Sequence, residues 1–518
     1  MKIPVLIILG FSLVSALLSY LQESIMASFS EKIGLYLRTA VTEKFNKLPM
    51  SYFDTHQVGD ILSRVTSDIN RVSNVMLTGV NQMLSSLVNV LFGVVLLFVI
   101  SPGLTWIVLG VLVVSSLATK WISEKNRKYS DEAQTQLGAL NNDIEEFMTG
   151  NVIVKSFNLQ EQATASIEEI NHRHYKAFKK AQFINYAIYP VIRILNQVAF
   201  VISAVYGAVL VIQGRMSIGT VQAYLQYINQ ISEPITNFAY VINALQGAMA
   251  SLERITDILD EDEMVPEQPK LTELADPQGK VEFNHVKFGY TKDKILMNDI
   301  SFVAKPNEMI AIVGPTGAGK TTLVNLLMRF YELNDGYIAL DDVKTTDMSR
   351  SAIRRIFGMV LQDTWLFEGT IAENIAYGKK EATRAEIIEA AKAAQCDFFI
   401  STLPDGYDTV ISSEDSMVSQ GQQQLLTIAR ILLADPAMLI LDEATSSVDT
   451  RTEVVIQQAM KRAMKGRTSF IIAHRLSTIQ SADLILVMKD GDIIETGTHE
   501  ELLEKRAFYY DLYQSQFA

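Results

Sequence analysis

A glycine-rich loop at residues 314–322 has the spacing of a phosphate-binding motif. It reads Gly-Pro-Thr-Gly-Ala-Gly-Lys-Thr-Thr and fits the pattern G-x-x-x-x-G-K-[ST]. An apolar, strand-like run precedes it and an apolar helical pattern follows it, so backbone N–H groups and a helix N-terminus would face phosphate. The loop predicts a nucleoside triphosphate site, with Lys320 at the β- and γ-phosphates and the Thr321 hydroxyl on Mg²⁺. The other nucleotide contacts are expected from Gly314, Thr316, Gly317, Gly319 and Thr322.

A second candidate motif is a pair of adjacent carboxylates, Asp442 and Glu443, at the end of an apolar run. By themselves, two acidic residues after a strand more often belong to a surface turn. Together with the glycine loop they predict a second nucleotide motif. In it Asp442 would hold Mg²⁺, directly or through water, and Glu443 would polarise the attacking water.

Length and composition indicate more than one domain and a membrane. The chain has 518 residues, 48% of them hydrophobic, and a mean hydropathy of +0.16, which is high for a soluble protein. Acidic residues outnumber basic ones, 58 to 45, and nearly all of the excess follows residue 258. This acidic second half argues against a nucleic acid partner, which needs clustered basic charge. A single cysteine, Cys396, excludes an intrachain disulfide or a cysteine metal cluster.

Long uncharged runs predict helices that cross a membrane. They cover residues 3–22, 72–119 and 194–214, and Ser101-Pro102-Gly103 divides the second run into two spans. A further apolar segment, which contains Glu233-Pro234, covers residues 218 to about 245 and predicts another span. A secretory signal is the alternative for the first run. That run is long for a signal and lacks a clear small-x-small cleavage site, so we favour a span. The sequence therefore predicts five spans.

An odd number of spans places the two ends of the membrane part on opposite sides. The nucleotide-binding half must face the cytosol, where ATP is, so the N-terminal end would face outside. This orientation puts many basic residues on the cytosolic side, as is usual for membrane proteins. They lie in the two long connections and are Lys32, Arg38, Lys44, Lys47, Lys120, Lys125, Arg127, Lys128, Lys176, Lys179 and Lys180. We therefore expect a multi-pass protein of the cell membrane.

The two cytosolic connections have helical patterns, each interrupted by a break, at residues 49–59 and near Gly150. A helix of about 26 residues, at ~1.5 Å per residue, projects about 40 Å, well beyond the bilayer surface. Amphipathic hairpins of this length normally need a surface on which to pack.

The expected fold is an all-α polytopic membrane domain followed by an α/β domain. We place the membrane domain and its hairpins at residues 1–255, an acidic, proline-containing linker at 256–279, and the ATP-binding domain at 280–518. Strand patterns in the last domain cover residues 281–290, 308–313, 337–341, 357–361, 437–442, 469–473 and 483–488.

With these motifs the whole chain resembles a half-transporter of the ABC exporter family, in which a membrane domain precedes a P-loop ATPase domain. The resemblance implies ATP and Mg²⁺, a second half-transporter, membrane lipid and a transported small molecule. It also implies that the breaks near residues 50–59 and 150–157 are coupling helices that dock on the ATPase domains. Four more positions match family motifs: Tyr290 stacks on adenine, Gln362 senses Mg²⁺ and the membrane domain, Asp449 reaches the partner ATPase, and His474 contacts the γ-phosphate.

The chain departs from the family at its signature, which is Leu-Ser-Gly-Gly-Gln in relatives and here Val418-Ser419-Gln420-Gly421-Gln422. In the family this segment opens a helix and caps the γ-phosphate on the partner. Ser419, Gly421 and Gln422 are retained, whereas Gln420 adds a side chain where phosphate and backbone approach closely. Ser413 replaces a family glutamate just before it. We therefore favour a heterodimer with two unequal ATP sites, with a homodimer as the alternative.

A second departure is the number of spans, because the family has six and the run at residues 3–22 resembles its second. The first span is expected to be missing, through truncation, a misassigned start or an incomplete gene. The alternative function is therefore a truncated or regulatory subunit that binds ATP and a partner but does not transport alone. The expected cargo is an amphiphilic small molecule or lipid. Glu233 either faces the central cavity, lies near the membrane interface or pairs with another helix.

Overall fold

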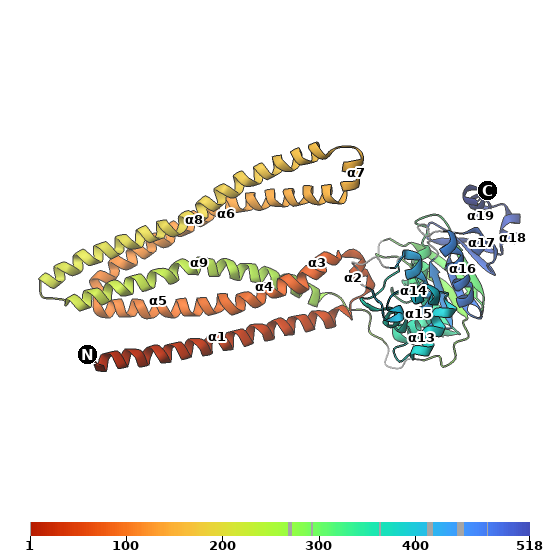
Figure 1. Cartoon of the computed structure of the whole chain (residues 1–518), viewed down its shortest axis with the longest axis horizontal. Helices are drawn as coiled ribbons and strands as arrows, with labels where there is room; N and C mark the ends of the chain where they lie inside the picture. The colour runs from red at the N-terminus through yellow and green to blue at the C-terminus, as the bar shows by residue number, and fades with distance from the viewer. Residues whose placement is uncertain are drawn as a thin grey trace. The chain divides into compact units, whose positions relative to one another are not determined.

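The computed structural model describes residues 2–267, 272–291, 294–361, 364–411, 418–442, 450–473 and 475–517. The chain forms two compact units, drawn in Figure 1. The helical unit comprises Met1–Asn46 and Val58–Glu261, and the α/β unit comprises Lys47–Gln57 and Asp262–Ala518. The chain therefore enters the α/β unit twice, first through an eleven-residue excursion and then at the end of its last long helix.

The helical unit consists of long helices joined by short turns (Figure 1). Its elements are α1 Lys2–Phe45, α3 Val58–Ser63, α4 Ile69–Asn74, α5 Asn81–Ile100, α6 Pro102–Thr149, α7 Asn151–Ser156, α8 Gln160–Ile212 and α9 Ile218–Asp260. Two π-helical stretches, Arg64–Asp68 and Val75–Val80, connect α3, α4 and α5 into one continuous helix. α6 and α8 lie side by side as a hairpin with α7 at its tip.

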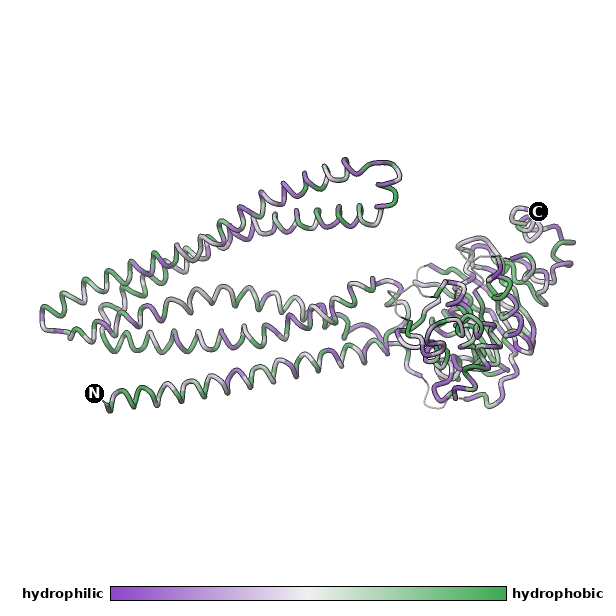
Figure 2. Tube along the Cα trace, viewed as in Figure 1, coloured by the Kyte–Doolittle hydropathy of each residue, from purple (hydrophilic) through white to green (hydrophobic). Residues whose placement is uncertain are grey.

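Four helical stretches of the described residues are long and apolar enough to cross a membrane: Ile3–Phe45, Val58–Ile100, Pro102–Thr149 and Gln160–Ile212. They contain the first three predicted spans and residues 194–212 of the fourth, which was predicted to reach residue 214. α9 is one helix through Pro234, and the membrane crossing predicted for residues 218 to about 245 stays a prediction. Figure 2 shows that the arms of the α6–α8 hairpin become more hydrophilic toward α7, as expected for a part outside the bilayer.

The predicted turns are confirmed, and local chemistry explains them. Ser101 is extended (φ −158°, ψ 98°) and α6 begins at Pro102, whose fixed φ suits the first turn of a helix. Ser217 caps α9 by accepting a hydrogen bond from the Thr220 N–H at 3.1 Å. Gly150 lies between α6 and α7, where the hairpin break is predicted.

An apolar core joins α5, α6 and α9. Its buried members are Leu97, Leu104, Val108, Tyr224, Ile228 and Ile231. Gly93 permits this packing, because a Cβ there would lie 2.6 Å from Cγ1 of Ile231. The hydroxyls of Thr105 and Tyr224 form a buried hydrogen bond at 3.2 Å, so each hydroxyl has a partner within this contact.

A buried carboxylate fixes the start of the α3–α5 helix against the end of α9. Asp68 accepts hydrogen bonds from the Ser251 hydroxyl and the Arg254 Nε, both at 2.8 Å, and also from Arg254 Nη2. Asp68→Ala is expected to destabilise the helical unit by about 1.5–3 kcal/mol, because it leaves the Arg254 guanidinium and the buried Ser251 hydroxyl without their acceptor. Thermal unfolding of the purified protein in detergent measures this.

Asp60→Ala is the matched control for this prediction. Asp60 forms an exposed ion pair with Arg64 one helical turn away, at 2.8 Å, and such pairs contribute little. Equal unfolding temperatures for the two variants would contradict a structural role for Asp68.

The α/β unit contains α2 (Met50–Thr55) and the elements from β1 onward (Figure 1). Its strands are β1 Val281–Phe288, β2 Met297–Ala304, β3 Met309–Val313, β4 Asp335–Leu340, β5 Val343–Lys344, β6 Phe357–Val360, β7 Gly369–Thr370, β8 Val410–Ile411, β9 Met438–Asp442, β10 Thr468–Ile472, β11 Leu484–Lys489 and β12 Asp492–Gly497. Its helices after α2 are α10 Lys320–Leu327, α11 Arg350–Ile356, α12 Ile371–Ala376, α13 Arg384–Ala393, α14 Asp397–Thr402, α15 Gln420–Ala434, α16 Thr450–Met464, α17 Leu476–Gln480, α18 His499–Lys505 and α19 Phe508–Phe517.

In the described part of the chain, a six-stranded sheet has the order β12-β11-β3-β10-β9-β6 and is parallel except for β12. An antiparallel four-stranded sheet, β2-β1-β4-β5, packs on one face through a core that includes Phe283, Ile310 and Phe470. Helices α12, α13 and α15 cover the other face around Ala311 and Leu439. Burial on both faces explains why the central strands are continuous apolar runs.

The short helix α2 packs in the α/β unit. Leu48 and Tyr52 are buried there, and the Met264 N–H donates to the Lys47 carbonyl at 2.8 Å. His56 stacks on Tyr52, with ring centroids 4.2 Å apart. The first of the two predicted coupling helices therefore docks on the α/β unit, as the resemblance implies.

Candidate nucleotide site

The glycine loop runs from the end of β3 to the start of α10, as predicted. Gly319 has φ +97° and precedes the first helical residue, Lys320. At Gly314, φ is +155° and a Cβ would lie 2.3 Å from the Met488 carbonyl oxygen. Both positions need glycine, because left-handed backbone and close approach exclude a side chain. The spacing of the motif therefore has a direct conformational reason.

Lys320 lies within the loop that it terminates. Its ammonium donates to the carbonyl oxygens of Gly314 and Pro315 at 2.9 and 3.0 Å. Burial lowers the pKa of Lys320, and the negative charge of Asp442 partly offsets that shift. The carboxylate therefore lies within electrostatic reach of the ammonium, although the two residues are far apart in sequence.

Strand order brings the two motifs together. β10 lies between β3 and β9, and Ile472 is level with both Ile312 and Asp442. The carboxyl ends of the three parallel strands thus meet at one edge of the sheet, where open α/β sheets bind their ligands. Asp442 is half-buried at the end of β9. The placement fits a cation held between this carboxylate and bound phosphates.

The two threonines at the start of α10, Thr321 and Thr322, differ in exposure. Thr321 is exposed, as a hydroxyl that reaches Mg²⁺ must be. Thr322 is buried, and its hydroxyl is 2.9 Å from the Tyr290 hydroxyl. Thr316 and Gly317 are exposed in the loop itself.

Tyr290 presents a ring face beside the loop. Its side chain is 51% exposed, and Phe288 and Tyr331 pack edge-on against it, with ring centroids 5.1 Å away in both cases. An exposed aromatic held by such edge contacts can stack a purine base. Tyr331 has no counterpart among the predicted site residues, and its sequence signal was only an aromatic pair shortly after the loop helix.

The altered signature segment forms the start of α15. Ser419 and Gln422 make a capping box, in which the Gln422 N–H donates to Ser419 Oγ at 3.4 Å and the Ser419 N–H donates to Gln422 Oε1 at 2.9 Å. Gln420 is exposed and Gly421 is buried. The Ser419 hydroxyl accepts in this box and keeps its own O–H to donate, so the box is compatible with an anion at this helix start.

Four predicted site residues, Gln362, Glu443, Asp449 and His474, lie outside the described residues, as does Ser413. Their roles stay predictions. The side chain of Glu233 is also outside the description.

Comparison with known proteins identifies the family. Residues 1–235 match the ABC transporter transmembrane region and residues 297–446 match the ABC transporter ATPase domain. The chain belongs to the ABC transporter family, as an exporter half-transporter with its ATPase fused behind the membrane domain. It is a multi-pass membrane protein with a cytoplasmic ATPase domain, and its ATP hydrolysis is coupled to transport.

Relatives with specific names extend over nearly the whole chain. A fatty acid ABC transporter ATP-binding/permease protein of Mycobacterium bovis is 45% identical over 97% of this chain and 80% of its own length. An ATP-dependent lipid A-core flippase of Syntrophus aciditrophicus is 35% identical over 99% of this chain and 85% of its own. A solved structure of a bacterial Atm1-family ABC exporter with ATP bound superposes with a TM-score of 0.79 at 26% identity, over 100% of this chain and 92% of that one.

Proposed function

We propose that this chain exports an acyl-chain amphiphile, a fatty acid or lipid, across the cytoplasmic membrane as one half of a dimeric ABC exporter. The proposal depends most on the 45% identity to the fatty acid transporter, which extends through the membrane helices that would contact cargo. The second relative, named a lipid A-core flippase, has a cargo of the same acyl-chain chemistry. The apolar character of the spans is compatible with such a cargo.

In the proposed site, ATP would stack its adenine on Tyr290 and place its phosphates against the glycine loop and Lys320. Mg²⁺, which we propose is held by Thr321, Asp442 and Gln362, would neutralise charge that develops on the transferred phosphoryl group. Glu443 would act on the attacking water, and His474 would contact the γ-phosphate. Asp449 and the segment Ser419–Gln422 would act across the dimer. The ammonium of Lys320 must exchange its two loop carbonyls for phosphate oxygens on binding.

A reconstitution experiment tests the cargo. The chain and its partner half-transporter, in liposomes with ATP and Mg²⁺, are expected to move a fluorescent fatty acid or lysolipid across the bilayer. Liposomes containing the Lys320→Ala variant provide the control for passive movement. ATP-dependent transport of a cationic dye, with no movement of either acyl probe, would contradict the proposal.

We also propose that the partner is a different half-transporter with a regular signature. The exposed side chain of Gln420 stands where the family has glycine, so two copies of this chain would each present an altered signature to the other's ATP. The intact loop, Glu443 and His474 of this chain would then hydrolyse ATP only against a regular signature.

The purified chain alone is therefore expected to hydrolyse ATP slowly, and Gln420→Gly should raise that rate several-fold by removing the Cβ near phosphate. ATP turnover of the detergent-purified chain is the measurement. Gln420→Ala removes the amide but keeps the Cβ, so it should raise the rate of ATP hydrolysis less than Gln420→Gly does. Vigorous hydrolysis by the unmodified chain on its own would contradict the heterodimer.

A further inference from the structure

The residues that directly follow α10 connect the nucleotide site to α2. The ring of Tyr331 lies perpendicular to that of Tyr290, with centroids 5.1 Å apart and an interplanar angle of 90°. On its other side, the Tyr331 hydroxyl donates a hydrogen bond to the Asp54 carboxylate of α2. One side chain thus contacts both the aromatic face proposed for adenine and the first docked coupling helix.

Tyr331 keeps its proton in this position. Burial, and then the hydrogen bond and charge of Asp54, raise the pKa of the phenol. The hydroxyl therefore donates to the carboxylate throughout the physiological pH range. Hydrogen bonds to a charged acceptor are stronger than those between neutral groups.

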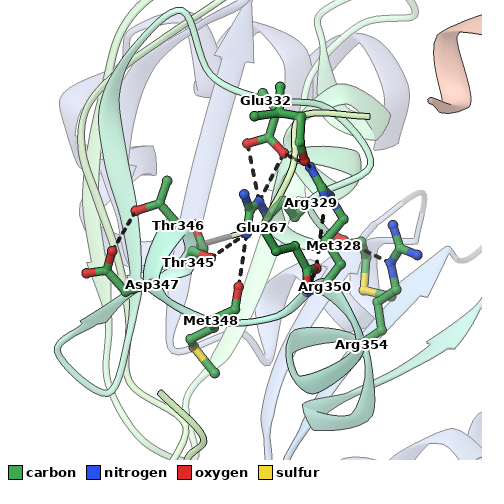
Figure 3. Close-up of polar contacts among 11 residues, drawn as sticks. Glu267, Met328, Arg329, Glu332, Thr345, Thr346, Asp347, Met348, Arg350 and Arg354 are labelled. Carbon is green, nitrogen blue, oxygen red and sulfur yellow. Dashed lines mark hydrogen bonds and ion pairs between the residues drawn. The ribbon is translucent and has the colours of Figure 1, made fainter. Parts of the chain in front are cut away.

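Glu332, the next residue, helps to hold the segment that follows α9, which is the second connection between the α/β unit and the membrane helices. Its carboxylate accepts from the Arg329 Nε at 3.1 Å and from the Arg350 Nη2 at 2.5 Å (Figure 3). The same Arg350 Nη2 donates to the Val265 carbonyl at 2.9 Å, and the Arg350 N–H donates to Glu267 at 2.8 Å. Arg329 and Arg350 are both buried. The segment that continues from α9 is therefore attached to the unit through buried charged groups.

The two connections also contact each other. The Met264 N–H of the α9 extension donates to the carbonyl of Lys47, which precedes α2. Both points at which the chain leaves the helical unit are thus held by neighbouring residues, α2 by Tyr331 and the α9 extension by Glu332. These residues lie immediately beyond the helix that starts at Lys320.

We propose that Arg329–Glu332 is a junction that couples occupancy of the adenine face to both chain connections, with Tyr331 as the positioning residue for α2. This inference rests on the proposed adenine contact at Tyr290. A base stacked on Tyr290 restricts its ring, the perpendicular Tyr331 ring is restricted with it, and its hydroxyl then holds Asp54. Tyr331 itself neither touches phosphate nor takes part in the chemistry.

Hydrogen exchange of the full-length protein with its partner in detergent tests the junction. The probe is the non-hydrolysable ATP analogue AMP-PNP with Mg²⁺, so no transported substrate is required. In the unmodified protein the analogue is expected to slow amide exchange of Lys47–Gln57 by roughly fivefold. Tyr331→Phe keeps the ring and removes the hydroxyl, and should abolish that slowing while AMP-PNP affinity stays within about twofold.

Tyr337→Phe is the matched control, because the Tyr337 hydroxyl on β4 also donates to a carboxylate, that of Glu282 on β1, at 3.2 Å. It should retain the full protection. Asp54→Ala should reproduce the Tyr331→Phe result. The double variant should lose no more of the protection at Lys47–Gln57 than either single variant does. Protection that persists in Tyr331→Phe, or that is absent from the unmodified protein although the analogue binds, would overturn the junction. A protein that does not bind the analogue at all would instead overturn the proposed nucleotide site.

Discussion

Lys320→Ala is expected to lower the affinity for Mg–ATP by about 100-fold and to abolish transport. The ammonium already lies inside the glycine loop, 2.9 and 3.0 Å from two of its carbonyl oxygens, so little rearrangement is needed to reach phosphate. Loss of charge-assisted contacts to two phosphates removes about 3 kcal/mol of binding free energy, which corresponds to that factor. Calorimetric titration of the purified protein with Mg–ATP is the measurement.

Lys344→Ala is the control for this prediction, because the Lys344 ammonium lies over the Tyr337 ring in the same unit, 4.5 Å from its centroid. ATP affinity should not change in that variant. Lys320→Arg tests the geometry of the contact. The guanidinium keeps the positive charge, but it is larger and planar and cannot replace the compact ammonium inside the loop. Unchanged affinity in Lys320→Ala would mean that the phosphates bind elsewhere.

Glu443→Gln should reduce the rate of ATP hydrolysis by about 100- to 1,000-fold and leave ATP affinity within about twofold. Glutamine keeps the size and hydrogen bonding of the side chain but cannot accept a proton from the attacking water. In the sequence Glu443 directly follows Asp442, the last residue of β9, and the carboxyl end of β9 lies at the edge of the sheet at which the glycine loop begins. Phosphate release under saturating ATP, together with nucleotide binding, separates the two effects.

Glu389→Gln provides the comparison for this substitution, because Glu389 is an exposed carboxylate on α13. Its turnover should equal that of the unmodified protein. Full turnover by Glu443→Gln would exclude Glu443 as the base and leave His474 as the next candidate.

Sequence periodicity predicted the elements that are buried on both faces. β3, β9 and β10 are continuous apolar runs because helices and a second sheet cover them. β2 and β12 were missed, since each has an exposed side and charged residues such as Asp299, Asp492 and Glu495. Such half-exposed, antiparallel strands have a weak local sequence pattern, and whether they form depends on the strand with which they pair. The six residues of α2 carry no amphipathic period, so the family resemblance, and not periodicity, predicted a helix in that break.

The sequence by itself determined the chemistry of this protein. The glycines that need left-handed backbone lie within a few residues of the lysine at the helix start, and each long uncharged run is one continuous stretch of chain. Each signal is therefore local, and spacing along the chain is sufficient to recognise it. Tertiary structure alone decided which distant groups meet. Insertion of β10 between β3 and β9 brings Asp442 within electrostatic reach of Lys320. Docking of α2 joins Tyr331 to Asp54 across 277 residues. These contacts depend on strand order and packing, which no local period of the chain records.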